Sequence, residues 1–298
     1  MVAAEAPAPL PGPIDPTETF RFASKDGTEL YGEAFIAGDP RAAAIVVHGY
    51  GDHAGRYREL AHVLTDLGLT TLAYDTRGHG RAAGQRGHVR RFSEYLDDLD
   101  AALAQLAKRA AGADKNGVLA IAHSHGGLVV LRALTDPGRT PAAITAAILS
   151  SPFLGIAARV SPAKAVIGRI ASRLSPRLSL PSGIVIDHLT HDPQKRAERR
   201  GDSLCHDVAS ARWYTEMLAA HAYVREHAAR VSIPTAWLVA SSDLIVDPAC
   251  SRQVYRGLRA PAEYHELSGL YHEVMNETDR GAVFGLIKAF IQQKFLPQ

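Results

Sequence analysis

Short, almost unbroken apolar runs recur along the chain and are separated by amphipathic segments. The apolar runs cover residues 42–47, 69–75, 117–122, 144–150 and 234–240, and each has the length of one strand that is buried on both faces. The segments at residues 56–68, 93–111, 126–134 and 249–258 have the apolar spacing of helices that cover a core. This alternation predicts an α/β fold, with a mainly parallel sheet and helices on both of its faces.

Two further sheet elements are predicted at the ends of this pattern. Residues 19–24 and 29–36 flank a turn that contains Asp26 and Gly27, which is typical of a β-hairpin. Residues 262–267 predict the last strand, before a loop and a final helix.

The interval of residues 152–212 breaks the strand-helix rhythm, and we expect it to form a helical cap inserted after the sixth strand. Residues 19–151 and 213–298 then form the core, and residues 1–18, rich in Pro and Ala, form a flexible arm. Residues 151–212 hold ten Lys or Arg against five Asp or Glu, a net charge of +5, which leaves −3 for the rest of a chain whose total is +2.

One cap helix, within residues 163–177, places Val166, Ile167, Ile170 and Leu174 on one face. This basic, amphipathic helix is suited to transient contact with an anionic lipid surface. An apolar face packed over the pocket, with arginines that are merely solvated, explains the pattern equally well. Residues 194–202, QKRAERRGD, are interpreted as a solvated charge run.

Composition changes this picture little. The chain has 298 residues, 46% of them apolar and 21% charged, as in an ordinary soluble protein. A net charge of +2 gives no reason to expect a nucleic-acid partner. We recognise neither a signal peptide nor an apolar run of roughly 18 residues, and we expect a cytoplasmic protein that is at most peripheral to a membrane. Cys205 and Cys250 are expected to be free thiols, and nothing in the sequence indicates the oligomeric state.

Candidate chemistry appears first in the stretch AIAHSHGGL, residues 120–128. Ser124 lies between a buried strand and a helix, and the residues two before and two after it are the small Ala122 and Gly126. Such a strand-to-helix turn is the nucleophile-elbow pattern, in which the serine hydroxyl stands above the carboxyl end of the sheet. His123 and His125 are disfavoured as its base, because neighbouring positions point their side chains away from the hydroxyl.

A serine nucleophile requires a base and an acid that orients the base. Asp243 and Asp247 follow the strand of residues 234–240. Asp247 precedes Pro248 at the start of a helix, which is a capping arrangement, so Asp243 is the predicted acid. His272 lies in the loop after the last strand, whereas His265 lies within that strand, so His272 is the predicted base.

The loop HGYGDHAGRY, residues 48–57, supplies the predicted oxyanion hole. Gly49 and Gly51 allow the backbone to bend, so that the N–H of Tyr50, together with that of His125, can bind the oxyanion. His48, Asp52 and His53 are also potential metal ligands, but no further ligands accompany them in a recognisable spacing. We therefore expect no metal and no cofactor.

Five segments together resemble the monoacylglycerol lipase and lysophospholipase branch of the α/β-hydrolases. They are HGYGDHAGRY, DTRGHGRAAGQRG, AHSHGG, SSDLIVDP and YHEVMNE, and the similarity runs in order from about residue 20 to the C-terminus. The resemblance implies the α/β-hydrolase fold with an eight-stranded sheet. It also implies a triad of Ser124, Asp243 and His272, and a small-molecule ester substrate with a fatty acyl chain. Ala122 departs mildly from the branch's first elbow glycine, and the cap matches weakly, which leaves the substrate open.

Several functions remain compatible with these residues. Monoacylglycerol hydrolysis is the leading interpretation, and lysophospholipase or general carboxylesterase activity would use the same triad. A proline-type aminopeptidase would need carboxylates near the pocket for a free amino group, and the positive cap disfavours it. A dehalogenase would carry Asp in place of Ser124. A non-catalytic binder of a hydrophobic ligand is the alternative from a different class, although the chain retains all three triad residues.

Overall fold

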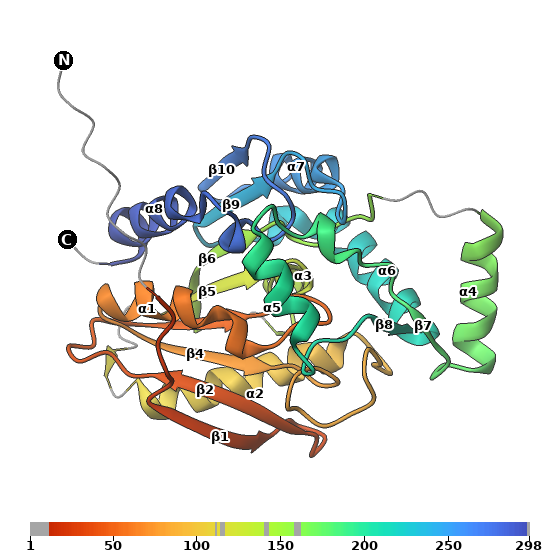
Figure 1. Cartoon of the computed structure of the whole chain (residues 1–298), viewed down its shortest axis with the longest axis horizontal. Coiled ribbons are helices and arrows are strands. Elements are labelled where there is room, and N and C mark those ends of the chain that lie inside the picture. The colour runs from red at the N-terminus through yellow and green to blue at the C-terminus, as the bar shows by residue number, and fades with distance from the viewer. Residues whose placement is uncertain (1–11, 111, 114–116, 140–142, 158–161, 297–298) are drawn as a thin grey trace.

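A computed structural model describes residues 12–110, 112–113, 117–139, 143–157 and 162–296. At its centre is an eight-stranded sheet in the order β1-β2-β4-β3-β5-β6-β9-β10 (Figure 1). The strands are β1 Glu18–Ala23, β2 Glu29–Phe35, β3 Ala42–Val47, β4 Leu69–Asp75, β5 Val118–His123, β6 Ile144–Ser150, β9 Thr235–Ala240 and β10 Ala262–Leu267. The hairpin β1–β2 is antiparallel and β2 joins β4 antiparallel, whereas all pairs from β4 to β10 are parallel. The predicted α/β class and mainly parallel sheet are confirmed.

Helices cover both faces of this sheet. On one face lie α1 Arg58–Asp66 and α8 Arg280–Phe290, and on the other lie α2 Ser93–Arg109, α3 His125–Thr135, α6 Ala211–His227 and α7 Pro248–Arg256. Strand β3 contributes side chains to the core on both faces of the sheet. Ala43, Ile45 and Val47 pack on one face, and Ala44 and Val46 pack on the other. The short helices are η1 Ala54–Tyr57, η3 Ile186–His188, η4 Ala228–Arg230, η5 Val274–Asn276 and η6 Ile291–Phe295.

The parallel strands end at one edge of the sheet, and their loops carry the predicted site residues. Strand β3 leads into the loop of Tyr50, and β5 leads directly into Ser124. Strand β9 precedes Asp243, and β10 precedes His272. In an open parallel sheet this carboxyl edge is where ligands bind.

Residues 152–212, the cap segment, follow β6 and contain α4 Pro162–Leu174, β7 Ser179–Pro181, α5 Pro193–Gly201 and β8 Val208–Ser210. Helix α4 stands at the edge of the molecule, whereas α5 lies over the body (Figure 1). Helix α4 packs on α6 through small residues: Gly168 lies against Tyr214, and the Ser172 hydroxyl is 2.7 Å from that of Thr215. Its apolar face points outward, and each of its members is more than half exposed: Val166, Ile167, Ile170 and Leu174.

The sequence suggested that the charge run of residues 194–202 is solvated, but the structure shows that one of its arginines is buried. It forms most of α5, which begins at Pro193 with Asp192 as its N-cap, and Arg199 within it is only 7% exposed. Arg199 is buried because the helix lies against core residues that are distant in sequence, and a local charge pattern cannot indicate this.

The predicted arm of residues 1–18 lies partly outside the described residues, which begin at Gly12. The Gly12 carbonyl accepts a hydrogen bond from His62, and the Thr17 hydroxyl accepts one from the Ile36 amide. Residues 12–17 are therefore held against the core. Within the described part of the chain, no helix combines the length and apolar character needed to cross a membrane.

Candidate active site

Ser124 occupies a strained turn between β5 and α3. Its φ of 51° and ψ of −114° lie outside the regions that residues with a side chain ordinarily adopt. The turn brings backbones together so closely that a Cβ on Gly126 would lie 2.2 Å from the Val47 carbonyl oxygen. Ala122 is fully buried. A small residue at position 126 is thus a steric requirement of the turn, as the sequence pattern predicted.

The structure brings the three predicted triad residues together. The Ser124 Oγ lies 2.8 Å from His272 Nε2, and His272 Nδ1 lies 2.7 Å from Asp243 Oδ2. The other carboxylate oxygen of Asp243 accepts the amides of Ile245 and Val246 at 2.8 and 2.9 Å. Because an ionised carboxylate only accepts hydrogen bonds, the His272 proton lies on Nδ1, and Nε2 is free to accept from the serine hydroxyl.

The Asp243 carboxylate stabilises the protonated form of His272. Burial alone lowers the pKa of His272, but the charge and hydrogen bond of Asp243, with a smaller contribution from Glu273, more than offset this and raise the pKa above its ordinary value. Burial likewise raises the pKa of Asp243, and His272 with the two amides brings it below its ordinary value. These two pKa shifts favour protonation of His272 during the reaction while Asp243 stays ionised.

The rejected candidates take structural roles. Asp247 caps α7 by accepting the Ala249 amide, and His265 lies within β10, both as predicted. His123 hydrogen-bonds to Ser150 through Nδ1. Burial lowers the pKa of His123 to about 4 and that of His125 to about 3, so both are neutral near pH 7.

The oxyanion loop, residues 48–53, lies against Ser124. A Cβ on Gly49 would sit 3.5 Å from the Ser124 Cβ, and Gly51 adopts a φ of +66° that favours glycine. Within the described residues, neither the Tyr50 amide nor the His125 amide donates to a backbone carbonyl of a turn, loop or cap. His125 follows Ser124 at the N-terminus of α3, where backbone N–H groups provide positive potential. The pairing of its amide with that of Tyr50 as an oxyanion hole stays a prediction.

A cavity of about 640 Å³ extends from Ser124 beneath the cap segment. Its lining is mostly apolar and includes Phe153, Trp213 and Met217, and Ile167 and Leu180 lie at its exposed rim. This volume and character are those of a pocket for a small, largely apolar molecule.

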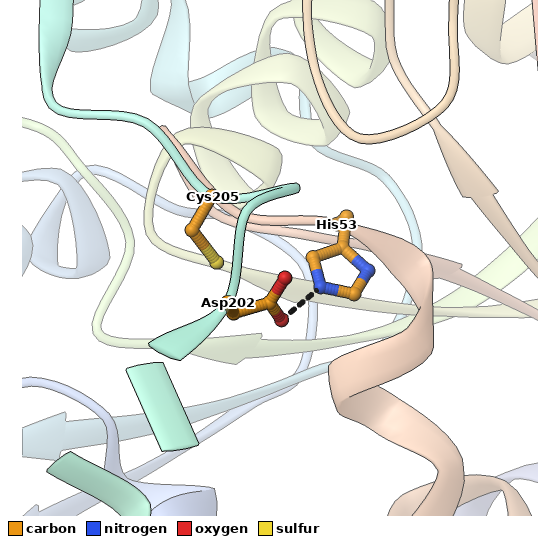
Figure 2. A group of neighbouring side chains, drawn as sticks. All are labelled: His53, Asp202 and Cys205. Atoms are coloured by element: carbon orange, nitrogen blue, oxygen red, sulfur yellow. Dashed lines mark hydrogen bonds and ion pairs between the residues drawn. The ribbon is translucent and has the colours of Figure 1, made fainter. Parts of the chain in front are cut away.

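His48, Asp52 and His53, considered above as metal ligands, do not form one group of potential ligand atoms. His48 pairs with Gly49 and Thr76, whereas His53 meets Asp202 and Cys205 from the cap segment, with ligand atoms within 4.8 Å of one another (Figure 2). The Gly55 amide donates to His53 Nδ1, so Nε2 carries the proton and donates to Asp202 at 2.7 Å.

The chemistry of this group therefore favours hydrogen bonding over metal binding. A metal on His53 Nε2 would require a proton on Nδ1, facing the Gly55 N–H. Arg199 donates to the Cys205 sulfur, and burial raises the pKa of that thiol to about 12. Both cysteines are free.

Comparison with known proteins places the chain in a family. The model of Hydrolase_4, described as serine aminopeptidase, S33, matches residues 38–279. The chain belongs to the Hydrolase_4 family of α/β-hydrolases. The chain is 32% identical to phospholipase YtpA of Bacillus subtilis over 85% of its own length and 96% of that protein.

Two further similar proteins are named as monoacylglycerol lipases. A monoacylglycerol lipase of Mycolicibacterium smegmatis is 28% identical, over 85% of this chain and 89% of its own length. The crystal structure of a monoacylglycerol lipase of Paleococcus ferrophilus superposes with a TM-score of 0.79 at 27% identity, over 88% of this chain and 98% of its own. This member of Hydrolase_4 is thus a serine hydrolase that acts on esters, in the monoacylglycerol lipase-like branch.

The tight packing at the elbow of this Hydrolase_4 member can be tested with two glycines. Gly126→Ala places its Cβ against the Val47 carbonyl, and we expect it to destabilise the fold by roughly 3 kcal/mol. Gly285→Ala, in α8 with open space around it, serves as the matched control and should stabilise the protein by about 1 kcal/mol. Thermal unfolding of both variants measures the difference; equal melting temperatures would show that the turn tolerates a larger residue.

Proposed function

We propose that the protein hydrolyses fatty-acyl esters, with monoacylglycerol as the leading substrate, through an acyl-enzyme on Ser124. The observation that carries the proposal is the contact of 2.8 Å between the Ser124 hydroxyl and His272, at one end of a mainly apolar cavity. The two relatives named for lipid-ester cleavage agree with this chemistry.

In the first half-reaction, His272 Nε2 accepts the proton of the Ser124 hydroxyl while the oxygen attacks the ester carbonyl. The carbonyl oxygen becomes negative and is stabilised by the amides of Tyr50 and His125. Asp243 holds the imidazole in its tautomer and stabilises the imidazolium. His272 then protonates the alcohol oxygen, which leaves as the carbon–oxygen bond breaks.

In the second half-reaction, a water molecule takes the place of the alcohol. His272 accepts a proton from the water, whose oxygen attacks the acyl carbonyl, and the same two amides receive the oxyanion. Collapse of this intermediate releases the fatty acid and returns the proton to Ser124. The chain's own groups complete the cycle, and no cofactor takes part.

The lining of the cavity bears on the substrate. An aminopeptidase needs a carboxylate to bind the free amino group of its substrate, and the described lining of the cavity contains no Asp or Glu. An apolar cavity instead suits an acyl chain. Lysophospholipids and simple esters present the same acyl group, so comparison of kcat/KM on monoacylglycerols, lysophospholipids, p-nitrophenyl esters and aminoacyl arylamides ranks these alternatives.

We also propose that the cap segment approaches lipid surfaces during catalysis. The exposed apolar face of α4 adjoins the rim of the cavity at Ile167, and the exposed Arg169 and Arg173 lie on the same helix. An apolar face flanked by cations suits an anionic lipid aggregate. Such a contact would place the cavity entrance at the source of substrate.

Replacement of the nucleophile tests the core of the proposal. Ser124→Ala should lower kcat on a short p-nitrophenyl ester by at least about a thousandfold, because the attacking oxygen is lost. The side chain points into a polar site rather than the core, so the far-UV spectrum and melting temperature should stay close to those of the parent. Wild-type turnover by this variant would eliminate the acyl-enzyme mechanism.

The raised pKa of His272 predicts the acid limb of the pH profile. The base must be neutral to accept a proton, so kcat/KM should fall as pH drops through a pKa above the ordinary histidine value. Asp243→Asn removes the carboxylate that raises this pKa, so the limb should move to lower pH while kcat falls steeply. Rates on a soluble ester across the pH range measure both effects; an unshifted limb would mean that Asp243 does not set the pKa of His272.

The lipid contact can be separated from the chemistry. The double variant Ile170→Ser and Leu174→Ser removes exposed apolar groups that do not line the cavity. Turnover of monoacylglycerol presented in anionic vesicles should fall about tenfold, with turnover of a soluble ester unchanged. Ile36→Ser, an exposed apolar position outside the cap segment, is the control. Parallel losses on both substrates would contradict a role in interfacial contact.

A further inference from the structure

The oxyanion loop is held by the cap segment at four consecutive residues. The Tyr50 hydroxyl donates to the Val208 carbonyl at 2.9 Å, and the Gly51 carbonyl accepts the His206 amide at 3.1 Å. Asp52 lies 3.6 Å from Arg199 in an ion pair, and His53 donates to Asp202 at 2.7 Å (Figure 2). The partners all belong to residues 199–208, which we call the clamp.

The fit between clamp and loop leaves no spare room. A Cβ on Gly51 would lie 2.2 Å from the His206 carbonyl oxygen and 3.2 Å from the Arg199 guanidinium. The Tyr50 ring packs against the ring of His206 in the clamp, with centroids 5.4 Å apart. On the core side it packs against Trp213 of α6, with centroids 3.9 Å apart. The cap segment thus contacts both the backbone and the side chains of the loop.

Another part of the cap segment, residues 189–191, reaches the loop that carries His272. The Leu189 carbonyl accepts the amide of Glu273, the next residue after His272, at 2.7 Å. The carboxylate of Glu277 accepts the amide of His191 and that of Tyr271 at 2.9 and 2.8 Å. The histidine loop is therefore fixed to the cap segment on both sides of its base.

A buried chain of ion pairs joins the two loops. Arg56 contacts Asp52 at 3.2 Å and Glu273 at 2.8 Å, and Arg199 extends the chain into the cap segment. Burial raises the pKa of Asp52 and Glu273, but Arg56 and Arg199 outweigh it, so the pKa of Asp52 falls well below its ordinary range and that of Glu273 to about 2. All members of this ion-pair network are charged near pH 7, and removing one member leaves a buried charge without its partner.

We propose that Arg199 and Asp202 are positioning residues that hold the oxyanion loop and the histidine loop in register with Ser124. Two parts of the cap segment then have different roles. Helix α4 contacts the lipid surface, and the clamp positions the loops of the catalytic site. The inference rests on the proposed function, because it assigns the clamp to the oxyanion and base of that reaction. A glycine-containing loop has little stiffness of its own, and misplacement by about 1 Å can cost a hundredfold in rate.

The test uses the full-length enzyme and p-nitrophenyl acetate, whose short acyl group needs little of the cavity. Arg199→Met should lower kcat about tenfold or more with KM little changed, because transition-state contacts weaken more than substrate binding. Asp202→Ala should act similarly, whereas Asp202→Asn retains an oxygen that accepts from His53 and should recover most of the rate. Arg200→Met is the control, since Arg200 is half exposed and pairs with Asp187.

Hydrogen exchange of the peptide covering residues 48–57 gives a readout that does not depend on turnover. Exchange should be faster in Arg199→Met and Asp202→Ala, and unchanged in Asp202→Asn and Arg200→Met. Unchanged exchange and kcat in folded Arg199→Met and Asp202→Ala would overturn the clamp. So would a loss of kcat that merely follows the fraction of folded protein. An inactive parent enzyme would instead refute the proposed function, and the exchange data would still decide the clamp.

Discussion

The hydrogen bonds of His272 impose the constraint on which the rest of the structure depends. One imidazole has to reach the Ser124 hydroxyl at 2.8 Å and the Asp243 carboxylate at 2.7 Å, although the three residues follow three different strands. A parallel sheet satisfies this constraint because β5, β9 and β10 all end at the same edge. The positive φ of Ser124 is the strain that lifts the hydroxyl to this meeting point, and the close packing of Gly126 shows that the surrounding backbone sustains it.

Much of this arrangement is predictable from the sequence, for local physical reasons. Buried parallel strands read as short apolar runs, so β3, β4, β5, β6 and β9 are predictable close to their observed bounds. The turn between β1 and β2 predicts that hairpin, and β10 is predicted as the last strand, before the final loop and helix. Ser124, Asp243 and His272, which the structure brings together, were identified because each lies in a loop after a predicted strand. Asp247 was set aside as a helix cap because Pro248 follows it, and its side chain does cap α7.

The cap segment was predicted less well, because its structure depends on contacts over long sequence distances. Arg199 belongs to a run that looks solvated, yet it is buried beside Asp52, 147 residues earlier in the chain. A signal for its helix was present: Asp192 and Pro193 repeat the pattern of Asp247 and Pro248. The apolar face of α4 is predictable, because helical periodicity identifies such a face. Periodicity does not indicate whether another element covers the face, and in the structure it is exposed. Charge and periodicity thus locate helices, whereas burial of individual charges requires the tertiary fold.

In the proposed mechanism, Ser124 is a nucleophile that His272 makes reactive. Labelling with a fluorophosphonate, followed by mass spectrometry of the peptides, tests it most directly, because the reagent forms a covalent bond only with an activated hydroxyl. We expect one adduct per chain on Ser124, and its loss in a folded His272→Ala variant. An adduct on another residue, or labelling of Ser124 at an undiminished rate without His272, would contradict it.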